Sequence, residues 1–257
     1  MNCILLGDEI GLPALYKVIK TLGWEIKSYD VSNKSSVELE IIEPLAHLRR
    51  IHIDDEKSMI NYLNQEKIDL GIVFSFNKII KEKILKSAGF KFINVHGGKI
   101  PEYAGANALN WAIINGEKEI GITVHEITEK IDNGPILSNW NLPIIDTDDA
   151  LSVRTKLVLS VEEKLPVIAS QYIEKELTPS ISVNKDLKLW KRRRPEDGEF
   201  DFSWTDEQIF NLVRGLVHPW PGAWFKNQDG TIKVFDRYLS LKEIADLRVR
   251  YMADGII

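Results

Sequence analysis

The sequence has one cysteine, no long hydrophobic run and fewer basic than acidic residues. Cys3 alone cannot form an internal disulfide or a thiolate metal cluster, and its place in an apolar run predicts a buried, inert thiol. No apolar stretch approaches the roughly 20 residues that a membrane-spanning helix needs. The start of the chain lacks the basic flank and cleavage signal of a secretory leader, so we expect a cytoplasmic protein with no membrane partner.

Several kinds of ligand are disfavoured by what is missing. With 33 Lys and Arg against 38 Asp and Glu, the net charge of −5 argues against nucleic acid as a partner. The histidines have no spacing typical of metal ligands, so no metal is predicted. Neither a Gly-x-Gly-x-x-Gly, a Walker nor a Gly-x-Ser-x-Gly motif occurs, so a dinucleotide, a P-loop phosphate and a hydrolase serine are unsupported.

Short apolar runs alternate with helical patterns over the first two thirds of the 257 residues. This alternation predicts an α/β fold with a Rossmann-like, mostly parallel sheet and helices on both faces. Strands are expected at residues 3–6, 24–29, 70–74, 92–95, 121–127 and 136–142. Helices are expected at 12–22, from Asp55, at 81–86, from Gly105 to Asn115, and from about 147, with a kink or an end at Pro166.

The alternation stops after about residue 180. Thr205 and Gln208 match a capping box before an amphipathic helix, and Asp229-Gly230 between apolar segments is typical of a hairpin. We therefore expect a larger domain over 1–180 and a small α+β domain over 181–257. The small domain is rich in aromatic residues that it cannot easily bury alone, so it is expected to pack on the main domain or on a second subunit of a homodimer.

The segment after residue 90 contains the candidate catalytic residues. Asn94 and His96 lie two apart at the end of an apolar run, so an extended backbone puts both side chains on one face, roughly 7 Å apart. An amide beside an imidazole can stabilise an oxyanion and move a proton. Asp132 follows in an Asp-Asn-Gly-Pro turn and could orient the imidazole. Each feature alone is more often structural, and His125 is interpreted as a half-buried sheet residue.

The order Asn94, His96, Asp132 resembles the formyltransferases that use 10-formyltetrahydrofolate. Residues 7–15 are similar to the opening strand and helix of that family, and 74–80 to the loop that holds the folate pterin. The basic junction and the C-terminal part are similar at 191–198, 211–215 and 219–223. Ala104 departs from the pattern, because many relatives carry a basic residue there.

The resemblance implies a catalytic Asn94, His96 and Asp132 and a 10-formyltetrahydrofolate co-substrate. It places the pterin in a pocket formed by two loops, whose predicted cofactor-binding residues are Phe76, Ile79, Ile80, Thr128 and Lys130. The amine of the acceptor would attack the formyl carbon while the Asn94 amide and the His96 ring stabilise the oxyanion.

The acceptor is expected to be a nucleotide-linked amino sugar, with a 4-amino-4,6-dideoxyhexose for a surface glycan such as lipopolysaccharide as the specific expectation. A transfer RNA would need many basic contacts, whereas the 30–56 region holds more acids than bases. A methionyl-tRNA or a glycinamide ribonucleotide acceptor, or a non-catalytic binding module, remain the alternatives. The predicted substrate-binding residues are Lys78, Glu102, Tyr103, Arg192, Arg193 and Arg194.

Overall fold

A computed structural model describes residues 1–32, 43–180 and 187–254. Part of the acidic 30–56 region and the expected domain boundary therefore lie outside the described residues. The chain forms two compact units: unit 1 contains residues 1–101, 122–140 and 157–187, and unit 2 contains 102–121, 141–156 and 188–257. In the described residues, no helix combines the length and the apolar character needed to cross a membrane.

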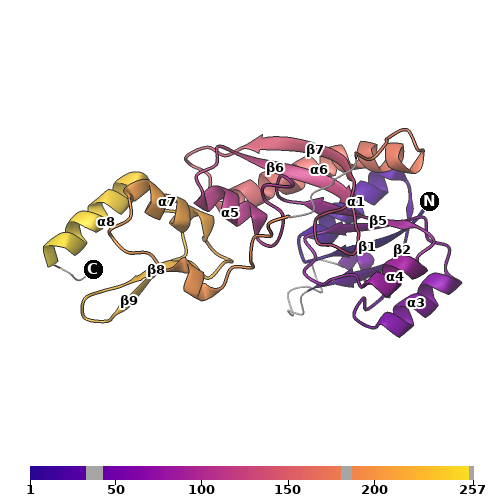
Figure 1. Cartoon of the computed structure of the whole chain (residues 1–257), viewed down its shortest axis with the longest axis horizontal. Helices are drawn as coiled ribbons and strands as arrows, with labels where there is room; N and C mark the ends of the chain where they lie inside the picture. Colours follow the sequence, from indigo (N-terminus) through magenta and orange to yellow (C-terminus); the bar gives the residue numbers. More distant parts are fainter. Residues whose placement is uncertain (33–42, 181–186, 255–257) are drawn as a thin grey trace. The chain divides into compact units, whose positions relative to one another are not determined.

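The main sheet has seven strands in the order β3-β2-β1-β4-β5-β6-β7. Figure 1 labels β1, β2, β5, β6 and β7 of this sheet. Strands β1 to β5 pair in parallel, and β6 runs antiparallel to β5. This confirms the predicted mostly parallel, Rossmann-like sheet. The bounds are β1 Asn2–Gly7, β2 Glu25–Val31, β3 Arg49–Arg50, β4 Leu70–Phe74, β5 Lys91–His96, β6 Glu119–Glu126 and β7 Ile136–Pro143.

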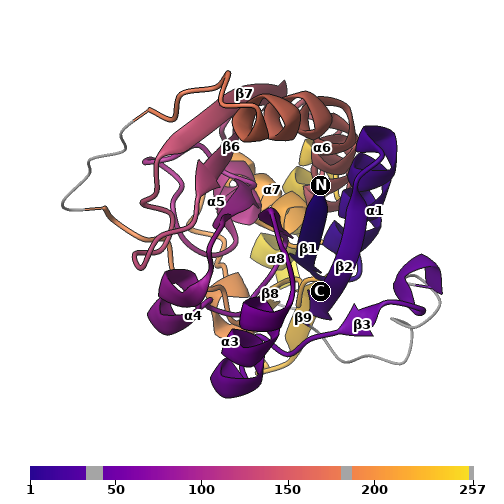
Figure 2. The same ribbon diagram turned by 90° about the vertical axis from the view of Figure 1, so that its right-hand side faces the viewer.

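Helices cover both faces of the sheet in unit 1. Helices α1 and α6 lie on one side, where Lys17 pairs with Glu162, and α3 and α4 lie on the other side (Figure 2). On the α3 side, Met59 and Ile84 are buried in one cluster with strand residues such as Ile4. The bounds are α1 Gly11–Leu22, α3 Glu56–Gln65, α4 Glu82–Ser87 and α6 Ala150–Ile173, with a 3₁₀ turn, η1, at Glu43–Leu45.

Local signals fix some of the helix ends. Gly23 ends α1 in the left-handed conformation at φ 64°, and the Asp55 carboxylate accepts the Ser58 amide at the start of α3. Of the two alternatives predicted at Pro166, a kink or an end, the end is wrong, because α6 continues to Ile173. Burial of Leu165 and Ala169 on either side of the proline supplies packing that offsets the lost backbone hydrogen bond.

Unit 2 is built from short elements around an aromatic core. Its capping box at Thr205 and its antiparallel hairpin are confirmed. The helix expected from Gly105 begins instead at Ala108, because Gly105 has φ 106° and pairs with Trp190. The bounds are α5 Ala108–Ile114, η2 Pro195–Gly198, α7 Asp206–Gly215, β8 Ala223–Lys226, β9 Ile232–Phe235 and α8 Leu241–Asp254.

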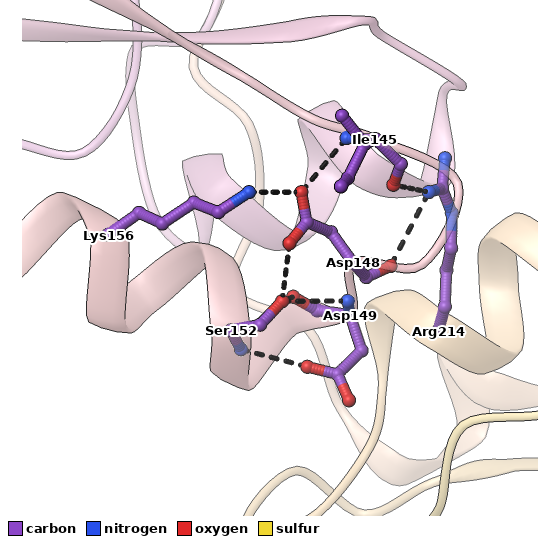
Figure 3. Close-up of polar contacts among 6 residues, drawn as sticks. All are labelled: Ile145, Asp148, Asp149, Ser152, Lys156 and Arg214. Atoms are coloured by element: carbon purple, nitrogen blue, oxygen red, sulfur yellow. Dashed lines mark hydrogen bonds and ion pairs between the residues drawn. The ribbon is translucent and has the colours of Figure 1, made fainter.

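The two compact units interleave along the chain, whereas the sequence predicts a larger domain over 1–180 followed by a smaller one. Arg214 on α7 is 1% exposed and donates to the carbonyl oxygens of Ile145 at 3.0 Å and Asp148 at 3.4 Å (Figure 3). These buried contacts link the 141–156 segment to α7, which belongs to the same unit but lies far along the sequence.

The Asp148 carboxylate is the centre of this network. It accepts hydrogen bonds from Lys156 at 2.5 Å, the Ile145 amide at 2.9 Å and Ser152 at 2.9 Å. Burial alone would raise the pKa of Asp148, but these donors outweigh it and hold the pKa below its ordinary value. The ionised carboxylate is therefore the form that the folded protein stabilises.

Because its pKa is lower in the folded protein, Asp148 stabilises the fold above the ordinary carboxyl pKa of about 3.9, and this contribution is lost as pH falls through the folded value. We expect Asp148→Asn to lower the urea midpoint at pH 7, and the difference from the unmodified protein to shrink at about pH 3. Asp146→Asn is the control, since the Asp146 side chain is 77% exposed. A difference that stays constant with pH would contradict this account.

Candidate functional site

Asn94 and His96 lie at the carboxyl end of β5, as the sequence predicts. They face the adjacent strand in register, with Asn94 opposite His125 and His96 opposite Thr123. Because side chains alternate along a strand, these four share one face of the sheet. His96 is buried, at 8% exposure, so its imidazole interacts mainly with protein groups and with whatever binds beside it.

Thr123 holds the backbone that follows β5. Its hydroxyl donates to the Gly98 carbonyl at 2.9 Å and accepts the Ile100 amide at 3.2 Å. A Cβ on Gly97 would come within 2.9 Å of the Leu157 side chain, so the backbone there passes close to α6. The loop that leaves the Asn94–His96 pair is therefore fixed by packing and hydrogen bonding together.

Asp132 reaches the same face from the turn between β6 and β7. Its backbone has φ 49°, a conformation that Asp tolerates better than most residues. Its Oδ2 lies 3.6 Å from His96 Nδ1, and both side chains are 10% exposed. This separation is long for a hydrogen bond, but in a poorly solvated site the carboxylate can still orient the ring and stabilise its charge.

His125 belongs to the same cluster, and the sequence interpretation missed it. Its Nε2 lies 3.2 Å from Asn94 Nδ2 and 3.5 Å from Asp132 Oδ1. The ring is 2% exposed rather than half-buried. The alternation of side chains along β6 was the available sequence signal, but the pairing of His125 with Asn94 depends on the register of β6 against β5, which the fold supplies.

An amide, two imidazoles and a carboxylate thus converge at the carboxyl edge of the sheet. This is the edge at which open α/β sheets bind ligands. The amide can donate to a developing oxyanion, and an imidazole beside a carboxylate can accept or deliver a proton. In the described residues, no group of three or more His, Cys, Asp or Glu side chains could hold a metal ion.

The predicted cofactor loop follows β4. Ile80 is buried at 6% exposure, whereas Ile79 is 66% exposed. The Lys78 ammonium lies 3.1 Å from both Asp30 and Asp54. Burial alone would lower the pKa of Lys78, but the hydrogen bonds and charges of the two carboxylates raise it above its ordinary value. Lys78 is therefore already neutralised by protein groups, which leaves it less available for a diphosphate.

A cavity of about 390 Å³ opens in unit 1 beside the turn that precedes Asp132. It includes the predicted residues Thr128 and Lys130, but Phe76, Ile79 and Ile80 do not line it. Its lining combines apolar and aromatic side chains with three lysines. The lining residues are Leu85, Lys86, Phe90, Lys91, Phe92, Ile127, Thr128, Glu129 and Lys130.

Unit 2 brings together part of the predicted substrate-binding set. The Tyr103 ring stacks on Trp190 with centroids 5.6 Å apart, and the Trp190 indole donates to the Glu102 carbonyl at 2.8 Å. Trp190 also packs on Trp111, and the Arg193 guanidinium lies over Trp111, 4.5 Å from its ring centroid. Glu102, Tyr103 and Arg193 therefore surround a shared indole cluster.

The polar groups of Tyr103 and Arg193 differ in how their hydrogen bonds are satisfied. The Tyr103 hydroxyl donates to Glu117 at 2.7 Å, and burial, reinforced by that carboxylate, raises the pKa of Tyr103 to about 12. Arg193 Nε is buried without a hydrogen-bond partner, although its terminal nitrogen donates to the Asp197 carbonyl. Arg192 and Arg194 are exposed. Arg193 is thus the member of the arginine run that retains an unsatisfied donor.

Comparison with known proteins covers most of the chain. Residues 32–168 match the family model described as formyl transferase, and residues 192–246 match its C-terminal domain. The bifunctional polymyxin resistance protein ArnA of Wigglesworthia glossinidia brevipalpis is 35% identical over 192 residues. The match covers 71% of this chain, which spans only 28% of that relative.

Solved structures share the fold at low identity. A 4-N formyltransferase from Francisella tularensis matches with TM-score 0.75 and 18% identity over 93% of this chain and 97% of that one. An N-formyltransferase from Helicobacter canadensis, in complex with folinic acid and dTDP-3-aminofucose, matches with TM-score 0.65 and 20% identity over 84% and 80% of the two chains. Since the family model alone spans more than half of the sequence, the chain belongs to the formyl transferase family.

Proposed function

We propose that this chain transfers a formyl group from 10-formyltetrahydrofolate to the amine of a nucleotide-linked amino sugar in the cytoplasm. The observation that carries the proposal is the meeting of Asn94, His96 and Asp132 at the ligand-binding edge of the sheet. Membership of the formyl transferase family supports the reaction. The Helicobacter canadensis relative, bound to folinic acid and dTDP-3-aminofucose, supports the two substrates.

In the proposed reaction, the neutral amine attacks the formyl carbon and negative charge develops on the formyl oxygen. The Asn94 amide and the His96 ring N–H donate to that oxygen. Asp132 sets the orientation of the His96 ring and helps to move the proton that leaves the amine toward the folate nitrogen. The proton then reaches the folate nitrogen as the carbon–nitrogen bond to the folate breaks, so the products are the formamide and tetrahydrofolate.

The cavity beside Asp132 is the proposed place for the pterin ring. Thr128 and Lys130 line it, and its Phe92 and Ile127 walls supply the apolar contact that a flat heterocycle needs. The Phe76–Ile80 loop remains part of the proposed folate site. A ring bound here would keep its formyl group close to the neighbouring Asp132 turn.

The indole cluster and the arginine run of unit 2 are the proposed contacts for the nucleotide sugar. A nucleotide offers a flat base and a diphosphate, and these suit stacking on aromatic rings and charge-assisted donation from Arg193. Arg192 and Arg194 would add charge at the surface, and Glu102 and Tyr103 would contact the hexose. We leave Lys78 out of the diphosphate contacts, because Asp30 and Asp54 already hold it.

A substrate panel tests the proposal. Nucleotide-linked 3-amino and 4-amino sugars, methionyl-tRNA and glycinamide ribonucleotide would each be incubated with 10-formyltetrahydrofolate, and the release of tetrahydrofolate measured. We expect a 4-amino-4,6-dideoxyhexose used for a surface glycan, such as lipopolysaccharide, to be the best acceptor.

The salt dependence of substrate binding further distinguishes a nucleotide sugar from a transfer RNA as the acceptor. A diphosphate presents few charges, so KM should rise modestly with salt, whereas a transfer RNA that makes several phosphate contacts should lose log affinity steeply against log salt. Turnover of methionyl-tRNA or glycinamide ribonucleotide at the rate of the best amino sugar would overturn the choice of acceptor. The absence of turnover with every acceptor would favour a non-catalytic binding module.

A further inference from the structure

Asn94 has a buried partner that the proposed reaction does not use. His125 stands directly opposite it in the antiparallel pairing of β5 and β6. The Asn94 Nδ2 and the His125 Nε2 are 3.2 Å apart, and the His125 ring is 2% exposed. The amide nitrogen of Asn94 is therefore turned toward a ring that has almost no contact with solvent.

The other ring nitrogen determines which protons His125 carries. Its Nδ1 lies 2.8 Å from the backbone carbonyl oxygen of Glu126. A carbonyl oxygen only accepts, so this hydrogen bond requires a proton on Nδ1. In the neutral ring, Nε2 then has a lone pair and no proton, and it accepts a hydrogen bond from the Asn94 amide.

We propose that His125 is a positioning residue that fixes the orientation of the Asn94 amide. One N–H of Asn94 binds the His125 lone pair, which leaves the second N–H to point at the developing oxyanion. The flipped amide would set its oxygen against that lone pair and present no donor in the same direction, so the ring selects the productive orientation. This inference rests on the proposed role of Asn94 as an oxyanion donor.

The tautomer of His125 with its proton on Nδ1 also keeps the Asp132 carboxylate available to His96. Asp132 Oδ1 lies 3.5 Å from His125 Nε2, and its Oδ2 lies 3.6 Å from His96 Nδ1. A nitrogen without a proton cannot donate to the carboxylate, so neutral His125 does not compete for it. The two histidines thus have different roles. His125 orients the Asn94 amide, and His96 takes part in the proton transfer.

Two substitutions separate the ring nitrogens of His125. The amide of Gln is placed near Nε2, so His125→Gln can still accept from Asn94; the amide of Asn is placed near Nδ1, so His125→Asn keeps only the Glu126 contact. We expect His125→Asn to lower kcat roughly 10-fold, a part of the ~10²–10³-fold cost of losing a whole oxyanion donor, with KM for both substrates nearly unchanged. His125→Gln should recover most of the loss. Equal loss in both variants, with matching melting temperatures, would overturn the proposal.

A mutant cycle tests whether His125 acts through Asn94. In an Asn94→Ala background, His125→Asn should have no further effect on kcat. A full effect of His125→Asn in that background would refute the positioning role and leave the role of Asn94 intact. Full turnover in Asn94→Ala alone would instead refute the proposed oxyanion donor.

The unmodified protein offers a test that does not depend on the folding of a variant. Nitrogen-15 NMR of the histidine side chains should find His125 protonated at Nδ1 and bare at Nε2 at neutral pH. A proton on Nε2 would give Asn94 no acceptor, and would overturn the inference regardless of any kinetic result.

Discussion

Replacing His96 with alanine is expected to lower kcat for formyl transfer by about 10²–10⁴-fold, the usual range for a positioned general acid–base group. The His96 imidazole is buried at 8% exposure beside the Asp132 carboxylate, so water cannot easily take its place. KM for both substrates should change little, because neither binding site depends on the ring alone. Stopped-flow or steady-state formylation with purified protein would measure the change.

His47→Ala is the matched control, because His47 is exposed and lies in a loop of unit 1. It should retain normal turnover. The loss in an Asp132→Ala, His96→Ala double variant should be far smaller than the product of the single losses, because the two residues act as a unit. Turnover of His96→Ala within a few-fold of the unmodified protein would remove His96 from the mechanism.

Gly134→Ala is expected to damage both stability and activity. A Cβ at this position would lie 1.7 Å from the Glu126 carbonyl oxygen, which is backbone and cannot swing away. Relief requires the turn to move away from β6, where the Glu126 amide donates to the Pro135 carbonyl at 2.9 Å. We expect a cost of about 1–3 kcal/mol in the free energy of unfolding. We also expect a ~10²-fold loss of kcat from displacement of Asp132.

Gly89→Ala provides the comparison, because no atom lies within 4 Å of a Cβ built there. That variant should keep both its melting temperature and its turnover. Thermal unfolding and kinetics of the two alanine variants would be measured side by side. An active Gly134→Ala protein would show that the position of Asp132 in the turn is not critical to catalysis.

Much of the fold follows from local patterns. The apolar run 70–74 is the strand β4 with the same bounds, Gly23 ends α1, and Thr205 begins α7 through its predicted capping box. Each of these signals acts within one turn or one strand, so no distant partner is needed to interpret it. The meeting of Asn94, His96 and Asp132 was likewise predicted, from their order and their resemblance to a family.

What the sequence could not provide depends on partners that are remote along the chain. His125 pairs with Asn94 only because β6 runs antiparallel to β5, and neither direction nor register is encoded in the composition of a single strand. The Gly105 conformation similarly depends on Trp190, whose backbone pairs with it from a distant segment. The sequence predicts Lys78 as a substrate-binding residue, whereas the fold places the carboxylates of Asp30 and Asp54 beside its ammonium group.

The buried Arg214 network limits how this protein can be divided or recombined. Its acceptors, Ile145 and Asp148, come from the middle of the chain, whereas the guanidinium comes from α7. In a chimera joined near residue 180, Arg214 would come from one parent and its two carbonyl acceptors from the other. The conformations of the two contacting segments would then be determined by different sequences. Exchange of the C-terminal part between relatives should therefore succeed only when the 141–156 segment is exchanged with it.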